Sequence, residues 1–250
     1  IAAKNSLQIL EAVLFDLEGD VLTLTASDSE TTIRTSLQVD DAQGSGKVAV
    51  GGKLLLETLK EFSEQPLSFQ IDENNFGLNI TSSNGTYSFV GANGNEYPEM
   101  PVEEGDNTFV IPANVLLDAI NKTIFCTADD ELRPVMNGIF FDLNEEKITM
   151  VATDAHRLVR YINTGVTGSQ AISFILPKKP AQLLKQVLQK ESEDVTVTFG
   201  QKNAKFAFGT TLIVCRQIEG RFPNYKAVIP SNNPNQVVVD RHTLINACKR

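Results

Sequence analysis

The residues whose types and spacing could do chemistry are Asp154 and His156, two apart in the segment VATDAHRL at 151–158. If that segment is a strand, the two side chains lie on one face. A carboxylate and an imidazole so placed can share acid–base work, or the carboxylate can orient an imidazole that ligates a metal. The chain has only two histidines, no G-x-S-x-G nucleophile turn and no phosphate-cradling glycine loop. The sequence therefore predicts no catalytic, metal or cofactor site; a hydrolase or nuclease activity abolished by His156→Ala would contradict this.

The same segment has an earlier copy, about 126 residues before it in the chain. Four short segments make up the two copies: LFDL at 14–17 and VLTLTASD at 21–28, then FFDL at 140–143 and ITMVATD at 148–154. Asp28 stands where the second copy has Asp154, but no histidine follows it. We therefore interpret Asp154 as a turn or strand-end residue that belongs to the fold.

A repeat of this length indicates duplicated domains rather than a short-period solenoid. An apolar run followed by a helical pattern opens the second copy at 108–120 and recurs at 236–248. The first copy has no such opening, so the chain is expected to be cut at both ends, with the first strand and helix of domain one missing. We predict three domains: 1–105, 106–231, and the start of a third at 232–250.

Hydrophobic periodicity predicts the elements of each unit. Alternating apolar and polar residues predict strands with one buried face at 21–25, 68–71, 87–90, 195–199 and 204–208. Helical spacing predicts short amphipathic helices at 53–62, 113–122 and 180–190, and a fourth beginning at 241. Each full unit has two such helices and about eight strands, in the order strand, helix, strands, twice over. The predicted fold class is α+β with antiparallel sheets.

Composition excludes several classes of protein. No apolar run approaches the roughly 18 residues that span a bilayer. Three scattered cysteines without C-x-x-C spacing indicate a reducing compartment and argue against a disulfide scaffold or a zinc site. The net charge of −9 disfavours a nucleic-acid binder at first sight.

The positive charge, however, gathers on the predicted helices. Nine of the 22 basic residues lie on or beside them: Lys53, Lys60, Lys178, Lys179, Lys185, Lys190, Arg241, Lys249 and Arg250. If the helices of all units line one surface, that surface is basic in an acidic molecule and can contact phosphates locally. The other interpretation is that amphipathic helices simply carry lysines on their solvated faces.

Three segments resemble motifs of one family, the bacterial sliding clamps, which are the beta subunits of DNA polymerase III. VATDAHRL at 151–158 resembles the family's T-D-G-H-R-L, and RPVMNGI at 133–139 resembles its R-x-x-x-N-G-[MIV]. GRFPNYKAVIP at 220–230 resembles its G-R-F-P-[DN]-Y-x-x-[VL]-[LI]-P. The resemblance extends in register along the whole chain.

The resemblance implies a DNA clamp fold, in which tandem clamp domains place antiparallel sheets outside and short helices on the inner face of a ring. It implies a head-to-tail homodimer of three-domain subunits that encircles double-stranded DNA as a processivity factor in the bacterial cytoplasm, at the nucleoid. Its DNA contacts are weak and independent of sequence, because strong ones would stall sliding. The implied protein partners are the replicative DNA polymerase, the clamp loader and repair polymerases, which bind through short linear motifs; no cofactor, catalysis or membrane is implied.

The resemblance also assigns roles to individual residues. The DNA-facing positions are Lys53, Arg133, Lys178 and Lys179. The partner-peptide pocket, an apolar groove for Leu and Phe anchors, takes Met136, Thr153, Ala155, His156, Arg157, Leu158, Pro223, Ala227 and Val228. The edge strand of the dimer contact is Tyr87, Ser88, Phe89 and Val90. Ala155 replaces the family's usual glycine and Ala227 stands where arginine is often found, so the peptide preference need not match that of the family.

Each assignment also has a simpler interpretation. Met136 and Leu158 could be ordinary core residues, the Phe-Pro pair at 222–223 a linking turn, and residues 87–90 an ordinary strand. For the whole chain, the remaining alternative is a β-rich adhesive repeat that binds no nucleic acid. The lysine-bearing helices disfavour that alternative.

Overall fold

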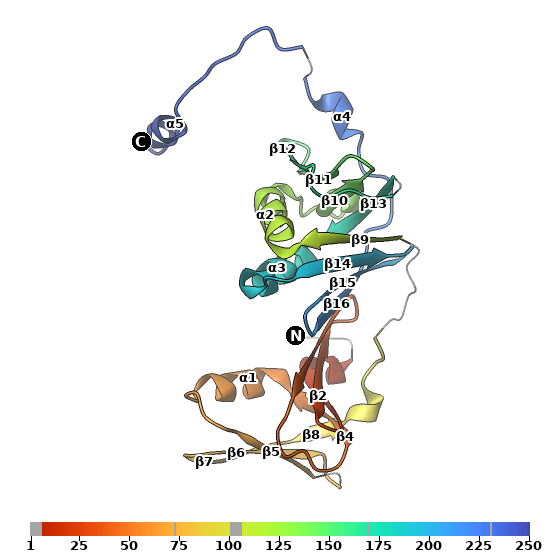
Figure 1. Cartoon of the computed structure of the whole chain (residues 1–250), viewed down its shortest axis with the longest axis vertical. Helices are drawn as coiled ribbons and strands as arrows, with labels where there is room; N and C mark the ends of the chain where they lie inside the picture. The colour runs from red at the N-terminus through yellow and green to blue at the C-terminus, as the bar shows by residue number, and fades with distance from the viewer. Residues whose placement is uncertain (1–6, 73, 101–106, 170, 231) are drawn as a thin grey trace.

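The computed structural model describes residues 7–72, 74–100, 107–169, 171–230 and 232–250 (Figure 1). The described residues form sixteen strands in three sheets, and the paired strands run antiparallel. The predicted α+β class with antiparallel sheets is therefore confirmed. The domain boundaries predicted at 105–106 and 231–232 fall on or beside residues outside the described part.

The first repeat unit has strands on both sides of a single described α-helix. Its elements are η1 (Gln8–Glu11, a 3-10 helix), β1 (Ala12–Glu18), β2 (Val21–Ser27), β3 (Thr31–Gln38), β4 (Gly46–Gly51), α1 (Gly52–Lys60), β5 (Ser68–Asp72), β6 (Gly77–Ser82), β7 (Gly85–Phe89), β8 (Gly91–Asn93) and η2 (Gly94–Glu96).

Between β9 and β16, the described residues of the second unit form two α-helices, each of which follows a strand. Its elements are β9 (Asn107–Pro112), α2 (Ala113–Thr123), η3 (Ile124–Cys126), η4 (Pro134–Met136), β10 (Gly138–Leu143), β11 (Ile148–Thr153), β12 (Leu158–Asn163), β13 (Ile172–Pro177), α3 (Lys178–Val187), η5 (Leu188–Lys190), β14 (Asp194–Phe199), β15 (Asn203–Phe208) and β16 (Thr211–Arg216). Helices α4 (Tyr225–Val228) and α5 (Arg241–Cys248) follow.

The predicted order of strand, helix and strands occurs twice in the second unit, as β9-α2-β10-β11-β12 and β13-α3-β14-β15-β16. Helix α3 begins at Lys178, two residues before the predicted start. Pro180 is accommodated in its first turn, where a backbone N–H has no helical partner to lose. The predicted helix at 241 is confirmed as α5, whose N-cap Asp240 accepts a hydrogen bond from the Thr243 N–H at 2.8 Å.

One sheet runs through both units. Its nine strands lie in the order β8-β4-β1-β2-β3-β16-β15-β14-β9, so the two units join where β3 of the first pairs with β16 of the second. The other two sheets belong to one unit each: β5-β6-β7 in the first, and β12-β11-β10-β13 in the second. The backbone ladder is therefore continuous across the join, which we call the interdomain seam.

Helices α2 and α3 close the core of the second unit. Leu116 and Ile120 of α2 and Leu184 of α3 are fully buried in one cluster with strands of both sheets, including Phe141 of β10 and Phe206 of β15. Burying a side chain of this size stabilises the fold by about 1.5–3 kcal/mol. Helices α1, α2 and α3 all lie on the same side of the molecule, on the left in Figure 1.

Strand β11 is buried along its whole length, although antiparallel strands usually expose one face. Its Ile148 and Met150 face the helix-covered core, and Val151 belongs to a second cluster on the opposite face of the sheet. That second face is covered by the segment that follows β16, through Phe222 and Tyr225. The segment therefore packs as an additional layer on the second unit.

Residues 232–250 are all solvent-exposed, including the apolar Val237, Val238 and Leu244. The cysteines carry free thiols; Cys126 and Cys215 are buried and Cys248 is exposed. Among the described helices, none combines the length and the apolar character that crossing a bilayer requires.

Candidate functional site

Asp154 and His156 do not lie on a strand. Strand β11 ends at Thr153 and β12 begins at Leu158, so both residues lie in the hairpin turn between them. Asp154 Oδ1 accepts hydrogen bonds from the backbone N–H groups of His156 (3.0 Å) and Arg157 (2.9 Å), and Oδ2 accepts one from Arg157 Nε (2.9 Å). These bonds, the Arg157 N–H foremost, lower the pKa of Asp154 to about 2. The expectation of a shared strand face was wrong, and the interpretation of Asp154 as a turn residue is confirmed.

The first unit builds the same turn between β2 and β3. Asp28 Oδ1 accepts hydrogen bonds from the N–H groups of Glu30 (3.1 Å) and Thr31 (2.7 Å). The residue after each aspartate has a left-handed backbone, with φ of 75° at Ser29 and 74° at Ala155. The repeated Ser/Thr-Asp pair therefore encodes a turn, since a carboxylate that bonds the backbone two and three residues ahead closes it.

Replacing Ala155 by glycine should stabilise the second unit by about 1 kcal/mol, because a side chain at positive φ strains the backbone and glycine does not. Denaturant unfolding of Ala155→Gly and wild type measures the difference. Ala155→Val is the opposing variant and should destabilise, since a β-branched residue tolerates this conformation least. Equal or lower stability of Ala155→Gly would show that the strain is relieved elsewhere in the turn.

The described residues hold no group of three or more His, Cys, Asp or Glu side chains that could ligate a metal. His156 is solvent-exposed, and the Asp154 carboxylate is bonded to Arg157 rather than to the imidazole. Asp154 and His156 therefore belong to a surface turn, and their geometry offers no acid–base relay.

An apolar cluster underlies the residues predicted for the partner-peptide pocket. Phe222 stacks on Phe140 of β10, with ring centroids 4.8 Å apart and planes 5° from parallel. Leu158, at the start of β12, and Val135 of η4, the neighbour of Met136, pack against the same cluster. Segments from three distant parts of the chain, at 133–139, 151–158 and 220–230, thus meet on one face of the four-stranded sheet.

A polar contact fixes the end of this cluster. The Tyr225 hydroxyl donates a hydrogen bond to Asp142 Oδ2 at 2.9 Å, and Lys226 Nζ lies 3.8 Å from the same oxygen. Burial, reinforced by the neighbouring carboxylate, raises the pKa of Tyr225 to about 12. The phenol therefore stays protonated and able to donate well above neutral pH.

The predicted pocket residues differ in exposure. Thr153 is buried, and Met136, Leu158 and Pro223 are half-buried. The exposed ones are Ala155, His156, Arg157, Ala227 and Val228, the last with 68% of its surface accessible. Half-buried apolar side chains beside exposed ones give this surface the mixed character expected of a peptide-binding site.

Arg157 joins the turn to the segment after α2. Its guanidinium donates to the Phe125 carbonyl oxygen at 2.9 Å and lies 5.5 Å from the centroid of the Phe125 ring. Phe125 itself is 57% exposed. Its place beside Arg157 was not predicted, because only the fold brings residues 32 positions apart together.

Three of the four predicted DNA-facing cations are bonded to aspartates. Arg133 Nε lies 2.8 Å from Asp130, and Lys178 Nζ lies 2.5 Å from Asp129. Lys179 at the start of α3 pairs with Asp28 of the first unit. Lys53 on α1 is exposed and has no such partner among the described residues. These pairings were not predicted, although the acidic run at 129–131 stands close to Arg133 in the chain.

Asn137 organises the acidic run. Its side-chain carbonyl accepts from the Asp130 N–H at 2.9 Å, and its amide donates to the Asp130 carbonyl oxygen at 3.0 Å. A Cβ on the next residue, Gly138, would lie 2.4 Å from the Leu176 carbonyl oxygen. In the 133–139 motif, Asn137 therefore holds the loop that contains Asp130, and Gly138 allows the neighbouring strand β13 to approach closely.

The predicted dimer strand lies at a sheet edge. Strand β7 pairs only with β6 among the described strands, and it contains Tyr87, Ser88 and Phe89. Val90 lies one residue beyond the strand and is 92% exposed, so the observed strand ends one residue before the predicted one. Tyr87 is partly covered by Phe62, with ring centroids 5.1 Å apart.

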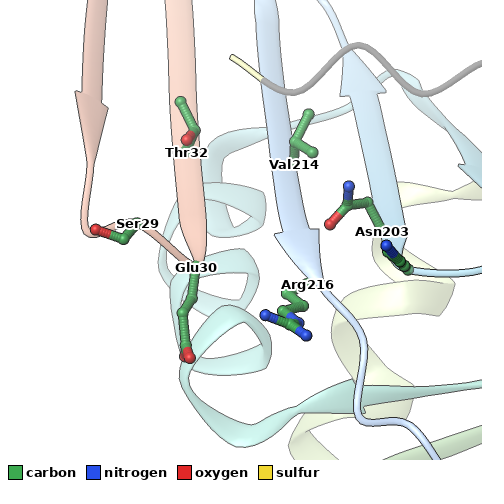
Figure 2. A pocket seen from close by; sticks show the side chains of 7 residues that line it. Ser29, Glu30, Thr32, Asn203, Val214 and Arg216 are labelled. Atoms are coloured by element: carbon green, nitrogen blue, oxygen red, sulfur yellow. The ribbon is translucent and has the colours of Figure 1, made fainter. Parts of the chain in front are cut away.

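A shallow depression of about 240 Å³ lies elsewhere, beside the interdomain seam (Figure 2). It is lined by Ser29, Glu30, Thr32, Lys202, Asn203, Val214 and Arg216. None of these residues belongs to the predicted pocket or to the predicted DNA-facing set. No motif in the sequence distinguishes them, and they meet only because β3 and β16 pair.

Comparison with known protein families assigns both units. Residues 1–101 match the model of the N-terminal domain of the DNA polymerase III beta subunit, and residues 110–224 match the model of its central domain. The chain belongs to the DNA polymerase III beta subunit family. A beta sliding clamp of Halalkalibacterium halodurans is 25% identical to it over 260 residues, and one of Pseudomonas aeruginosa is 26% identical over 252 residues. Each alignment covers 100% of this chain and 68% of the relative.

Solved structures of beta subunits share the fold. The DNA polymerase III subunit beta of Pseudomonas aeruginosa superposes with a TM-score of 0.92 at 25% identity, over 100% of this chain and 68% of the other. That of Thermotoga maritima gives a TM-score of 0.83 at 25% identity, over 92% of this chain and 62% of the other. The predicted DNA clamp fold of repeated domains is therefore confirmed.

Proposed function

We propose that this chain supplies two clamp domains of a DNA sliding clamp, a ring that encircles duplex DNA and tethers the replicative polymerase to it. The observation that carries the proposal is the interdomain seam, where two copies of one unit join edge to edge and keep their helices on one side (Figure 1). Further units joined in the same way would pair strands edge to edge at further seams and continue the helix-lined wall. Membership of the beta subunit family supports this function.

The repeat indicates how the ring would close. Strand β7 begins at Gly85, 126 residues before β16 begins at Thr211, so β7 is the counterpart of the strand that pairs at the seam. Strand β12 is likewise the counterpart of β3, since Leu158 stands 126 residues after Thr32. The chain thus offers a β16-type edge at one end and a β3-type edge at the other. Complementary ends assemble head to tail, and a second subunit would close the ring.

The cations on the helix side would meet DNA in the central hole. Lys53 of α1 and Lys178 of α3, together with Arg133, would carry the positive charge there, and aspartates partly neutralise the last two. Partial neutralisation suits a sliding ring, because each phosphate contact replaces an existing ion pair and gains little free energy. Topology rather than affinity would then hold the protein on DNA.

The surface over the Phe140–Phe222 cluster would act as the groove that receives the short linear motifs of partner proteins. Met136, Leu158, Pro223 and Val228 offer apolar surface, and Arg157 and His156 offer polar contacts at its rim. The replicative polymerase, the clamp loader and repair polymerases are the proposed partners. Such a protein would act without catalysis or a cofactor, in the cytoplasm where the DNA lies.

The test is retention on DNA of different topology. The full-length protein, loaded by its clamp loader onto nicked circular DNA, should co-elute with the circles in gel filtration. It should be released when a restriction enzyme linearises the same molecules, because a ring runs off free ends. Equal retention on circles and linear DNA would mean that it binds by affinity alone, and the clamp proposal would fall.

A further inference from the structure

Lys179 differs from the other predicted DNA-facing cations in the partner that holds it. The carboxylate of Asp28 is only 11% exposed, whereas Asp129, the partner of Lys178, is 78% exposed. Asp28 belongs to the β2–β3 turn of the first unit, and Lys179 to the first turn of α3 in the second. The pair therefore joins the two domains across the seam.

Asp28 has little freedom to release this lysine. Its Oδ1 is occupied by the N–H groups of Glu30 and Thr31, and its Oδ2 accepts the hydrogen bond from Lys179 Nζ. Burial opposes the ionisation of Asp28, yet the hydrogen bonds from Lys179 and from the two N–H groups outweigh it and lower the pKa. A phosphate that drew Lys179 away would leave a nearly buried carboxylate without its counter-ion, which is unfavourable.

We infer that Lys179 is a positioning residue of the interdomain seam, which fixes the angle between the two domains instead of contacting DNA. Lys179 was predicted to face DNA, and the inference replaces that prediction for this residue alone. It rests on the proposed function in one respect: in a ring, the angle between the two domains would set the curvature.

The interdomain seam needs a second contact of this kind, because strand pairing alone does not fix the angle between the two domains. Neighbouring strands in sheets twist by roughly 10–35° relative to one another. The β3–β16 ladder joins five residue pairs, from Thr31↔Cys215 to Thr35↔Thr211. The Asp28–Lys179 pair lies beyond the end of that ladder and involves a helix rather than a strand. A contact off the axis of the ladder resists the rotation that the ladder permits.

Comparison of the two repeat units explains why the β2–β3 turn can accept Lys179, whereas the equivalent β11–β12 turn is already occupied. In the second unit Arg157 follows the turn and occupies Oδ2 of Asp154, so that carboxylate is satisfied within its own hairpin. The first unit has Thr31 at the position of Arg157, and threonine cannot form an ion pair. Asp28 is thereby left with one oxygen to accept a lysine from the adjoining domain.

The angle can be measured by double electron–electron resonance between spin labels in the two domains. Labels at Asn84→Cys and Gln189→Cys, both exposed sites, are introduced into a Cys248→Ser chain, where the remaining cysteines are buried. Lys179→Ala and Asp28→Asn should each broaden the distance distribution, and the double variant should broaden it no further than either one. Asparagine keeps the side-chain oxygen that closes the turn, so Asp28→Asn removes the charge and preserves the hairpin.

Lys178→Ala is the matched control on the neighbouring residue, and salt-dependent DNA binding is the second readout. Lys178→Ala should leave the distances unchanged and lower the slope of log K against log salt by about 1. Lys179→Ala should leave that slope unchanged. Unaltered distances in Lys179→Ala and Asp28→Asn, or a slope lowered by Lys179→Ala as much as by Lys178→Ala, would overturn the inference. If Lys179→Ala broadens the distances and neither lysine variant changes the slope, the inference about Lys179 is supported. The same result would contradict DNA contact by Lys178.

Discussion

Phe222→Ala should free the segment after β16 from the second domain and weaken the binding of partner peptides by more than tenfold. Phe222 is 6% exposed and stacks on Phe140 at 4.8 Å, and Tyr225 packs in the same cluster. Removing a buried phenylalanine destabilises its surroundings by about 3–5 kcal/mol, through lost burial and the cavity left behind. Here the loss falls on the segment that carries three predicted pocket residues: Pro223, Ala227 and Val228.

Hydrogen exchange should show increased exchange of amides at 218–229 in Phe222→Ala, with the nine-stranded sheet still protected. Peptide affinity is measured by fluorescence anisotropy with a labelled peptide that carries Leu and Phe anchors. Phe222→Leu should retain most of the affinity, because it keeps an apolar side chain in the cluster. Phe69→Ala, at a 40%-exposed phenylalanine of the first domain, controls for the loss of a ring far from the groove. Wild-type affinity in Phe222→Ala would mean that the peptide binds elsewhere.

Much of the fold could be predicted because local chemistry and tertiary packing agree. The strands at 195–199 and 204–208 alternate in sequence and bury alternate residues in the structure. The repeated Ser/Thr-Asp pair closes the same turn in both units, since the bonds of Asp28 and Asp154 are local. The position of α3 was predicted to within two residues at its start by the same logic, because amphipathic spacing reports which face is covered.

The ion pairs of Lys178 with Asp129 and of Lys179 with Asp28 could not be predicted, because they depend on how distant elements meet. Lys179 and Asp28 are 151 residues apart, and only the seam brings them together. The burial of both faces of strand β11 could not be predicted for the same reason. One of those faces is covered by Phe222 and Tyr225, which belong to a later segment of the chain. Sequence periodicity reports a covered face, but it does not identify the segment that covers it.

Gly138→Ala should destabilise the second domain by about 1–3 kcal/mol, the range expected when a well-packed site is forced to accept a methyl group. A Cβ at this position would lie 2.4 Å from the Leu176 carbonyl oxygen and 2.9 Å from Ile175 Cγ2. The carbonyl belongs to β13, which pairs with β10 at this point, so the two strands must separate. Denaturant unfolding measures the loss, and Gly51→Ala is the control, since its Cβ would meet nothing within 4 Å.

The effect of Gly138→Ala should also reach the groove and the acidic run. Asn137 immediately precedes it and holds Asp130 through two hydrogen bonds, and Met136 lies one residue earlier at the end of η4. A shift at the start of β10 would therefore move Met136 and loosen the Asp130–Arg133 pair, which weakens peptide binding as well as stability. Asn137→Ala, which removes the two bonds and leaves the strand pair intact, should loosen the loop with a smaller loss of stability. If Gly138→Ala unfolds like wild type, the strands have room to adjust, and the Asn-Gly pair then requires an explanation other than close strand packing.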